Sequence, residues 1–155
     1  MLFGATLWYG HFREKGLKGV EDWLKRVKGM GFDYVEFTPD YPLLKQLEPV
    51  RLQQFKELLE STGLKIAIHV PWDLWLADPR EDVSEGSLQV VEKCMDLGKE
   101  LDTLYILTHI SMQQPLGLAT LRFPEVKDDV IKTAVDVAGR ISSMGDERSI
   151  PTLLE

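Results

Sequence analysis

GLKIAIHVPWDLWLADP, residues 63–79, holds the pattern that decides the fold. A glycine precedes the apolar run Leu64–Val70, which then opens into a long loop rich in proline, tryptophan and aspartate. Glycine commonly ends a helix, and a short apolar run bounded by turn residues is typical of a buried strand. His69 stands where this strand ends. It is therefore either a functional group held on the rim of a sheet or only a residue at which a strand stops.

The same unit of helix, glycine and strand recurs along the chain. Apolar residues at helical spacing between Val20 and Met30 lead to Gly31, and Phe32–Thr38 (FDYVEFT) follows with the composition of a strand. Further strands are predicted at Leu2–Leu7, Leu104–His109 (LYILTH) and Ile150–Glu155 (IPTLLE), and further helices from Pro49, from the capping-box segment Asp82–Glu85 (DVSE) and from Pro124. This alternation of strands and helices predicts an α/β fold with a parallel sheet.

The lengths of the connections add a functional expectation. The helix-to-strand turns are tight, whereas the strand-to-helix loops are long: WYGHFREKG, PDYPLLKQLEP, PWDLWLADPRED and ISMQQPLGLATLRF. Loops at the carboxyl ends of parallel strands are where barrels and open α/β sheets build their sites. We therefore expect every functional residue on one face of the sheet.

The spacing of the units matches a (β/α)₈ TIM barrel, which needs about 250 residues. A chain of 155 residues holds only part of one, so we expect a single domain over residues 1–155, the N-terminal part of a partial (β/α)₈ TIM barrel that stops after its fifth strand. An open sheet edge is seldom left uncovered. We expect this chain to form homo-oligomers through the exposed edge and to lack metal-dependent turnover on its own.

Composition excludes several functional classes. A formal net charge of −7 argues against nonspecific affinity for nucleic acid or anionic membrane. No apolar run approaches a membrane span, and the start of the chain lacks the features of a signal peptide, which predicts a cytoplasmic protein. Neither GxGxxG nor GxxxxGK[ST] occurs. The single cysteine, Cys94, falls on the apolar face of a helix, where packing is its expected role.

Three predicted strands end in side chains that can bind a metal ion. His69 ends the third strand, His109 the fourth and Glu155 the fifth, and neighbouring parallel strands place such residues in a row along the rim. Imidazole and carboxylate together suit zinc, manganese or divalent iron. Glu36, near the end of the second strand, is either a fourth member of this rim or a charge between the sheet and its helices.

Aromatic residues in the long loops are candidates for substrate contact. They are Trp8, Tyr9, Trp72 and Trp75, which could stack on the apolar face of a sugar and exclude water. Their alternative role, equally open for Trp75, is to pack the mouth of the barrel against the loops. His11 lies among the first of these aromatics and fits a pocket-lining or surface position better than a ligand position.

Together these pieces resemble a known group. GFDYVEF, HVPWDLWLADP and LYILTH are similar to the corresponding segments of the xylose isomerase-like barrel superfamily, which contains sugar-phosphate isomerases and epimerases and the endonuclease IV-type apurinic endonucleases. The resemblance implies that His69 and His109 are rim ligands or substrate contacts, as in the endonuclease branch. It implies that Glu155 is a metal ligand that serves the epimerase branch as a catalytic base. The family draws its remaining ligands from strands six to eight.

Three functions follow from the resemblance. The favoured one is a divalent-metal-dependent isomerase or epimerase of a sugar or sugar phosphate, in which Glu155, with His69, supports proton transfer through an enediolate. The first alternative is a zinc-dependent apurinic endonuclease, whose partner would be DNA. It is disfavoured because acidic residues outnumber basic ones in the rim loops. The second is a noncatalytic fragment or a binding protein on the same fold.

Overall fold

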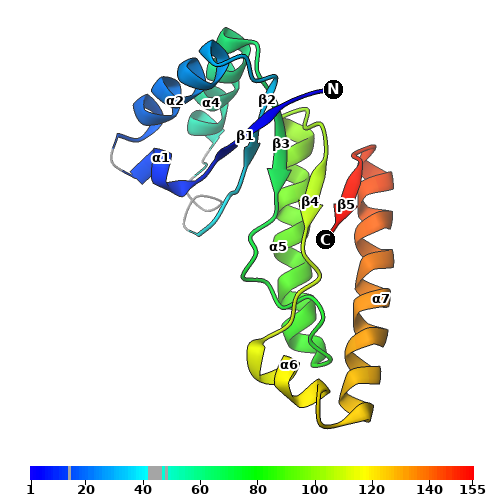
Figure 1. Cartoon of the computed structure of the whole chain (residues 1–155). Helices are drawn as coiled ribbons and strands as arrows, with labels where there is room; N and C mark the ends of the chain where they lie inside the picture. Colours follow the sequence, from blue (N-terminus) through cyan, green and yellow to red (C-terminus); the bar gives the residue numbers. More distant parts are fainter. Residues whose placement is uncertain (14, 42–46, 48) are drawn as a thin grey trace.

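The fold consists of a parallel sheet whose strands are connected by helices along the chain (Figure 1). The structure is a computed structural model that describes residues 1–13, 15–41, 47 and 49–155. The elements are β1 (Gly4–Leu7), α1 (Tyr9–Arg13), α2 (Leu17–Gly29), β2 (Tyr34–Phe37), α4 (Pro49–Thr62), β3 (Lys65–His69), α5 (Glu81–Glu100), β4 (Ile106–Thr108), α6 (Gln114–Thr120), α7 (Pro124–Arg148) and β5 (Thr152–Leu154). The strands lie in the order β1-β2-β3-β4-β5, and every pair is parallel. The α/β class and the parallel sheet expected from the sequence are confirmed.

The strands bury one face against the helices. Alternate strand residues fill the core because successive side chains of a strand point to opposite faces. The fully buried strand residues on this face are Leu7, Val35, Phe37, Ile68 and Ile106. They pack with Leu24 of α2, Phe55 of α4, Met95 of α5 and Ile141 of α7 in one hydrophobic cluster. The opposite face carries the side chains that alternate with them, among them the half-exposed Glu36 and His69 and the small, buried Ala67.

The strand register decides which of these half-exposed residues are neighbours. Glu36 of β2 is the register partner of Ala67 of β3, and His69 is the partner of Leu107 of β4. Beyond β4 the ladder continues, because the amide of Glu155 donates to the carbonyl of Thr108 at 3.0 Å. The carboxyl ends of β2, β3, β4 and β5 therefore lie side by side.

Two short helices and one helix start differ from the sequence expectation. Helices α1 and α6 lie inside loops that the sequence left without structure. The prediction that the capping box Asp82–Glu85 opens the helix is wrong. Helix α5 begins at Glu81 after the N-cap residue Arg80, and the Arg80 side chain makes no capping hydrogen bond. Arg80 instead donates its backbone N–H to the carboxylate of Asp78 at 3.0 Å, so a residue of the preceding loop stabilises this helix start.

Four turns that close the described helices have a residue in the left-handed region, one of them Ser149 after α7 with φ of 56°. Gly31 after α2 and Gly63 after α4 have φ values of 86° and 62°, as expected for glycines that end helices. Asp102 after α5 adopts φ of 52°, which a short polar side chain tolerates better than a branched one. These tight turns bring each strand back into the sheet directly after its helix.

Helix α7 approaches the sheet closely at one glycine. A Cβ added at Gly145 would overlap the Thr152 side chain and lie 2.8 Å from the carbonyl oxygen of Ile150, whereas nothing lies within 4 Å of a Cβ at Gly139 in the same helix. We expect Gly145→Ala to lower the free energy of unfolding by about 1–3 kcal/mol through overpacking. Gly139→Ala should raise it by about 0.5–1 kcal/mol through helix propensity. Urea unfolding followed by circular dichroism measures both, and equal effects would contradict this close approach.

The single cysteine and the helices bear on two further expectations from the sequence. Cys94 is fully buried, and burial raises the pKa of its thiol to about 12, which is consistent with a packing role. Among the helices that the structure describes, none has both the length and the apolar character needed to cross a membrane.

Association of two chains through a sheet edge stays a prediction. Light scattering on the purified chain would measure it, with β1 and β5 as the two edges available.

Candidate functional site

The centre of the candidate site is a pair of imidazoles from neighbouring strands. Nε2 of His69 lies 2.9 Å from Nε2 of His109, and the two rings are 4.9 Å apart between centroids. His69 ends β3, and His109 follows β4 by one residue. Because both strands run in the same direction, their ends place the two rings on the same rim. The two Nε2 atoms therefore face each other, and one proton or one cation can be shared between them.

Glu155 extends this pair to the next strand. Its Oε2 lies 3.9 Å from Nδ1 of His109, whereas His69 faces Nε2 of the same ring. The amide of Ile110 donates to the carbonyl of Glu155 at 3.1 Å, which fixes the Glu155 backbone beside β4. The Glu155 side chain is 67% exposed. Its backbone is therefore held in place, while its carboxylate can reach different positions around His109.

Glu36 joins the cluster from β2. Its Oε1 lies 3.1 Å from Nδ1 of His69, and its Oε2 accepts a hydrogen bond from the hydroxyl of Tyr105 at 2.7 Å. The hydrogen bond with His69, opposed by burial and assisted by Tyr105, lowers the pKa of the Glu36 carboxyl. Glu36 thus lies on the same face as His69 and not between the sheet and the helices. It is held as an ionised acceptor on the outer side of His69.

The chemistry and spacing of the rim side chains show how far they fit a divalent metal ion. Among the described residues, no three side chains of the His, Cys, Asp and Glu types are grouped closely enough to hold one. Two imidazoles on a tetrahedral zinc ion lie roughly 3.3 Å apart, since each bond is about 2.0–2.1 Å. The pair at 2.9 Å needs only a small opening, and the Glu155 carboxylate would have to move away from Nδ1 of His109 to join the two Nε2 atoms. The residues present therefore fit part of a divalent-metal site, with His69 and His109 as its core.

The aromatic residues of the rim loops differ in their exposure. Trp72 is 72% exposed and Trp75 43% exposed, both in the loop after β3, and Trp8 after β1 is 57% exposed. The side chain of Tyr9 lies outside the described part of the structure. The His11 ring stacks on Trp23 at 4.6 Å, and burial lowers its pKa. The exposed tryptophans are available for contact, whereas His11 packs against α2.

The loop that follows His69 is held by a buried carboxylate. The Asp78 side chain is fully buried, and Nε of Arg80 donates to its Oδ1 at 2.8 Å while Nη2 donates to Oδ2 at 2.5 Å. Backbone N–H groups add two anchors, from Ala77 to the carbonyl of Ser111 at 2.8 Å and from Trp75 to Oγ of Ser87 at 3.1 Å. The loop is thus fixed at its far end, which restricts the region that carries Trp75.

This anchor predicts a pH-dependent contribution to stability. Hydrogen bonding to Arg80 lowers the pKa of Asp78, so its contribution is complete above the unfolded pKa of about 3.9 and is lost as pH falls through the folded value. We expect Asp78→Asn to lower the free energy of unfolding at pH 7 by about 1–2 kcal/mol, a range reduced for the exposed Arg80. The difference from the wild type should shrink below about pH 4. Unfolding curves at pH 7, 5 and 3 measure this, and a constant difference would contradict it.

Two polar residues of the site were missed by the sequence analysis. Tyr105 precedes β4 and alternates with Leu107 and His109, so strand periodicity could have placed it on the site face. Asp40 lies in the loop after β2. Burial, and secondly the charge of Asp73 in the next loop, raises the pKa of Asp40. No pattern within its own loop marks Asp40, because its environment comes from another loop.

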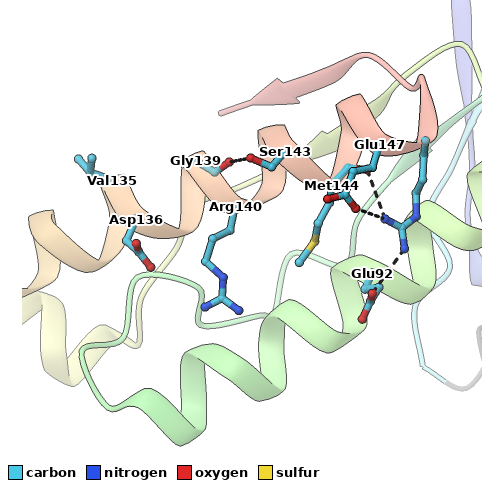
Figure 2. A pocket seen from close by; sticks show the side chains of 9 residues that line it. Glu92, Val135, Asp136, Gly139, Arg140, Ser143, Met144 and Glu147 are labelled. Atoms are coloured by element: carbon cyan, nitrogen blue, oxygen red, sulfur yellow. Dashed lines mark hydrogen bonds and ion pairs between the residues drawn. The ribbon is translucent and has the colours of Figure 1, made fainter.

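A hollow of about 620 Å³ lies elsewhere, between α5 and α7 (Figure 2). It is lined mainly by polar and charged side chains of these helices, and Arg148 crosses it to Glu92 with 3.4 Å between Nη2 and Oε1. Arg148 also donates from Nε to Asp96 at 2.9 Å. None of the rim histidines lines this hollow. Its ion pairs join the two helices, and it is separate from the candidate site.

Comparison with known proteins places this geometry in a family. The model of the family described as "Xylose isomerase-like TIM barrel" matches residues 24–155. A curated relative, a probable endonuclease 4 of Natranaerobius thermophilus, is 24% identical over 104 residues, which cover 64% of this chain and 37% of the relative.

Solved structures agree with the fold. A D-tagatose 3-epimerase-like protein superposes with a TM-score of 0.76 at 17% identity, and a D-psicose 3-epimerase of Clostridium cellulolyticum H10, solved with D-tagatose, does so with 0.76 at 14%. Each match covers 99% of this chain and 52% of the other. A protein of Mycobacterium smegmatis solved in complex with magnesium gives 0.70 at 17% and covers 99% and 54%. The partial TIM barrel is thereby confirmed, and the chain spans about half the length of these structures.

Proposed function

The chain belongs to the xylose isomerase-like TIM barrel family, and we propose that it carries part of the active site of a divalent-metal-dependent isomerase or epimerase of a sugar or sugar phosphate. The observation that carries this proposal is the pair of Nε2 atoms 2.9 Å apart on adjacent strands, with the Glu155 carboxylate on the next strand 3.9 Å from Nδ1, the other ring nitrogen of His109. Imidazole and carboxylate at one rim suit zinc, manganese or iron.

Each residue has a role in this proposal. A bound divalent ion would supply positive charge that stabilises the negative charge developing on the sugar oxygens during proton transfer. His69 and His109 would hold the ion through Nε2. Glu155 adds a carboxylate that binds the ion or takes the proton next to the sugar carbonyl. The exposed faces of Trp8 and Trp72 supply apolar surface on which a sugar ring can stack.

The net charge of the chain and the descriptions of similar solved structures favour a sugar over DNA as the substrate. The whole chain carries a formal net charge of −7, and Asp40 and Asp73 stand in the rim loops. Phosphodiester backbones require a positive surface, which a rim of this charge opposes. Two of the three structural neighbours named above are described as epimerases or epimerase-like, one of them solved with the ketose D-tagatose. These facts support a small sugar as the substrate class.

The endonuclease alternative has its own support. The curated relative is described as a probable endonuclease 4, and the pair of rim histidines fits zinc-dependent phosphodiester hydrolysis as well. In that case His69 and His109 would hold metal ions that activate water, and a DNA strand with an abasic site would lie across the rim. The two functions differ in substrate and share their metal ligands.

One experiment compares the two functions without requiring turnover by this chain. The protein is loaded with Mn²⁺, and the relaxation of ketose protons, D-tagatose among them, is measured by nuclear magnetic resonance. A double variant, His69→Ala with His109→Ala, is the matched control. Our proposal predicts faster relaxation with the wild type than with the variant. If instead abasic DNA is bound or nicked in a histidine-dependent way and ketose relaxation is unchanged, the endonuclease function replaces it.

A further inference from the structure

We infer that Glu36 and Tyr105 are positioning residues that set the tautomer and orientation of His69, leaving its Nε2 lone pair directed at the cation position. This inference deepens the proposed function and rests on it for the identity of the cation. Its geometric basis is a chain of hydrogen bonds along the site face of the sheet. It runs from Tyr34 through Tyr105 and Glu36 to His69.

Glu36 is held so that each carboxylate oxygen has one partner. Oε1 lies 3.1 Å from Nδ1 of His69, and Oε2 lies 2.7 Å from the hydroxyl oxygen of Tyr105. The side chains of Glu36 and His69 are each only 22% exposed, which limits competition from water. An ionised carboxylate has no proton to donate. The proton in the contact with His69 must therefore sit on Nδ1 of the imidazole.

The sheet register explains how Glu36 reaches His69. Glu36 pairs with Ala67, and His69 stands two residues further along β3 on the same face. Ala67 carries only a methyl group, so it offers no competing polar contact, and the longer Glu36 side chain can extend past it. A long side chain at position 67 would occupy this path.

Tyr105 binds the other carboxylate oxygen, and Tyr34 in turn binds the hydroxyl of Tyr105. Tyr105 has a single hydroxyl proton, and the shorter of its two contacts is the one with Glu36. The hydroxyl of Tyr34, 3.2 Å from that of Tyr105, is therefore the donor of the second bond. The two rings meet edge to face, with centroids 6.1 Å apart. A Cβ at Gly4 would overlap the Tyr34 ring, so glycine on β1 makes room for this tyrosine.

The tautomer matters because a metal ion binds only a nitrogen with a free lone pair. In water an isolated neutral imidazole of histidine favours the proton on Nε2, which blocks that nitrogen. A carboxylate that accepts from Nδ1 reverses the preference and also fixes the plane of the ring. In the metal-free protein the lone pair of His69 Nε2 then accepts the Nε2 proton of His109, as their 2.9 Å separation requires. The two histidines should thus have opposite tautomers.

Nitrogen-15 spectra of labelled histidine in the metal-free protein at pH 8.5 test this directly. We expect the Nδ1–H tautomer for His69 in the wild type and a shift toward Nε2–H in Glu36→Ala. Glu36→Gln should restore most of the wild-type pattern, because its amide oxygen still accepts a proton from Nδ1. Tyr105→Phe, which removes one hydroxyl, should shift His69 less and in the same direction as Glu36→Ala. The His11 signals serve as an internal control.

A second readout separates this inference from the proposed function. Titration with Zn²⁺ should show affinity about 10–100-fold weaker in Glu36→Ala than in the wild type, and largely restored in Glu36→Gln. If the wild type binds no Zn²⁺ but the tautomers behave as expected, the proposed function fails and the positioning role stands. If His69 carries its proton on Nε2 in the wild type, or keeps its tautomer in Glu36→Ala, the positioning role is overturned. Should Glu36→Ala fail to fold, an unchanged tautomer in Tyr105→Phe overturns it.

Discussion

Replacing His109 with alanine should weaken the binding of Zn²⁺ or Co²⁺ to this protein by at least about 100-fold, a larger loss than the 10–100-fold typical of a supporting residue. His109 is the central member of the rim, with Nε2 facing His69 at 2.9 Å and Nδ1 3.9 Å from the Glu155 carboxylate. Its loss removes one imidazole ligand and leaves His69 as the only imidazole at the rim. His69→Ala should have a comparable effect.

The measurement is a competition titration with a chromophoric chelator, supported by the visible spectrum of bound Co²⁺. His11→Ala is the matched control, because the third histidine stacks on Trp23 and takes no part in the imidazole pair. If His69 and His109 hold one ion, the double variant should lose little more affinity than either single variant, because ligands of one site are not additive. Additive losses, or a His11→Ala variant as weak as His109→Ala, would contradict a shared site.

The sequence was sufficient for the order of the fold because each unit carries local signals. Glycines 31 and 63 adopt the positive φ values that end helices, and the apolar runs after them become strands. Helices α1 and α6 were not anticipated, since neither has a buried apolar face long enough to give a periodic pattern. The start of α5 was misplaced because Asp78, a loop residue, binds the helix start in place of the expected capping residue.

The site was partly predictable for a similar reason. Histidine at the end of one strand is a weak signal, but His69 and His109 at equivalent ends of adjacent strands must be neighbours in a parallel sheet. Their actual contact, and the bond from Glu36 to the other nitrogen of His69, depend on the stagger between strands. Asp40 acquires its altered pKa from burial and from Asp73 in a different loop. Such effects come from tertiary structure and leave no mark in the local sequence.

Phe55→Ala should lower the free energy of unfolding by about 3–5 kcal/mol, a large part of the about 5–15 kcal/mol available to a typical domain. The Phe55 side chain is fully buried in α4. Its ring lies 5.3 Å from that of Phe37 in β2 and 6.1 Å from that of Phe12 in α1, measured between centroids. Truncation removes the apolar contacts of a whole ring and leaves a cavity where three elements meet.

This cluster also connects stability to the site. Phe37 directly follows Glu36 on β2 and points to the opposite face of the sheet, so the packing of Phe37 on Phe55 holds the strand end that presents Glu36. Urea unfolding measures the loss, and Val50→Ala, at a position 71% exposed in the same helix, should change the free energy by no more than about 0.5 kcal/mol. At urea concentrations where Phe55→Ala remains folded, the tautomer of His69 should already be less uniform than in the wild type. If the free energy of unfolding falls by less than about 1 kcal/mol, the three phenylalanines do not form a packed cluster, because removing an aromatic ring from a filled core site costs more than that.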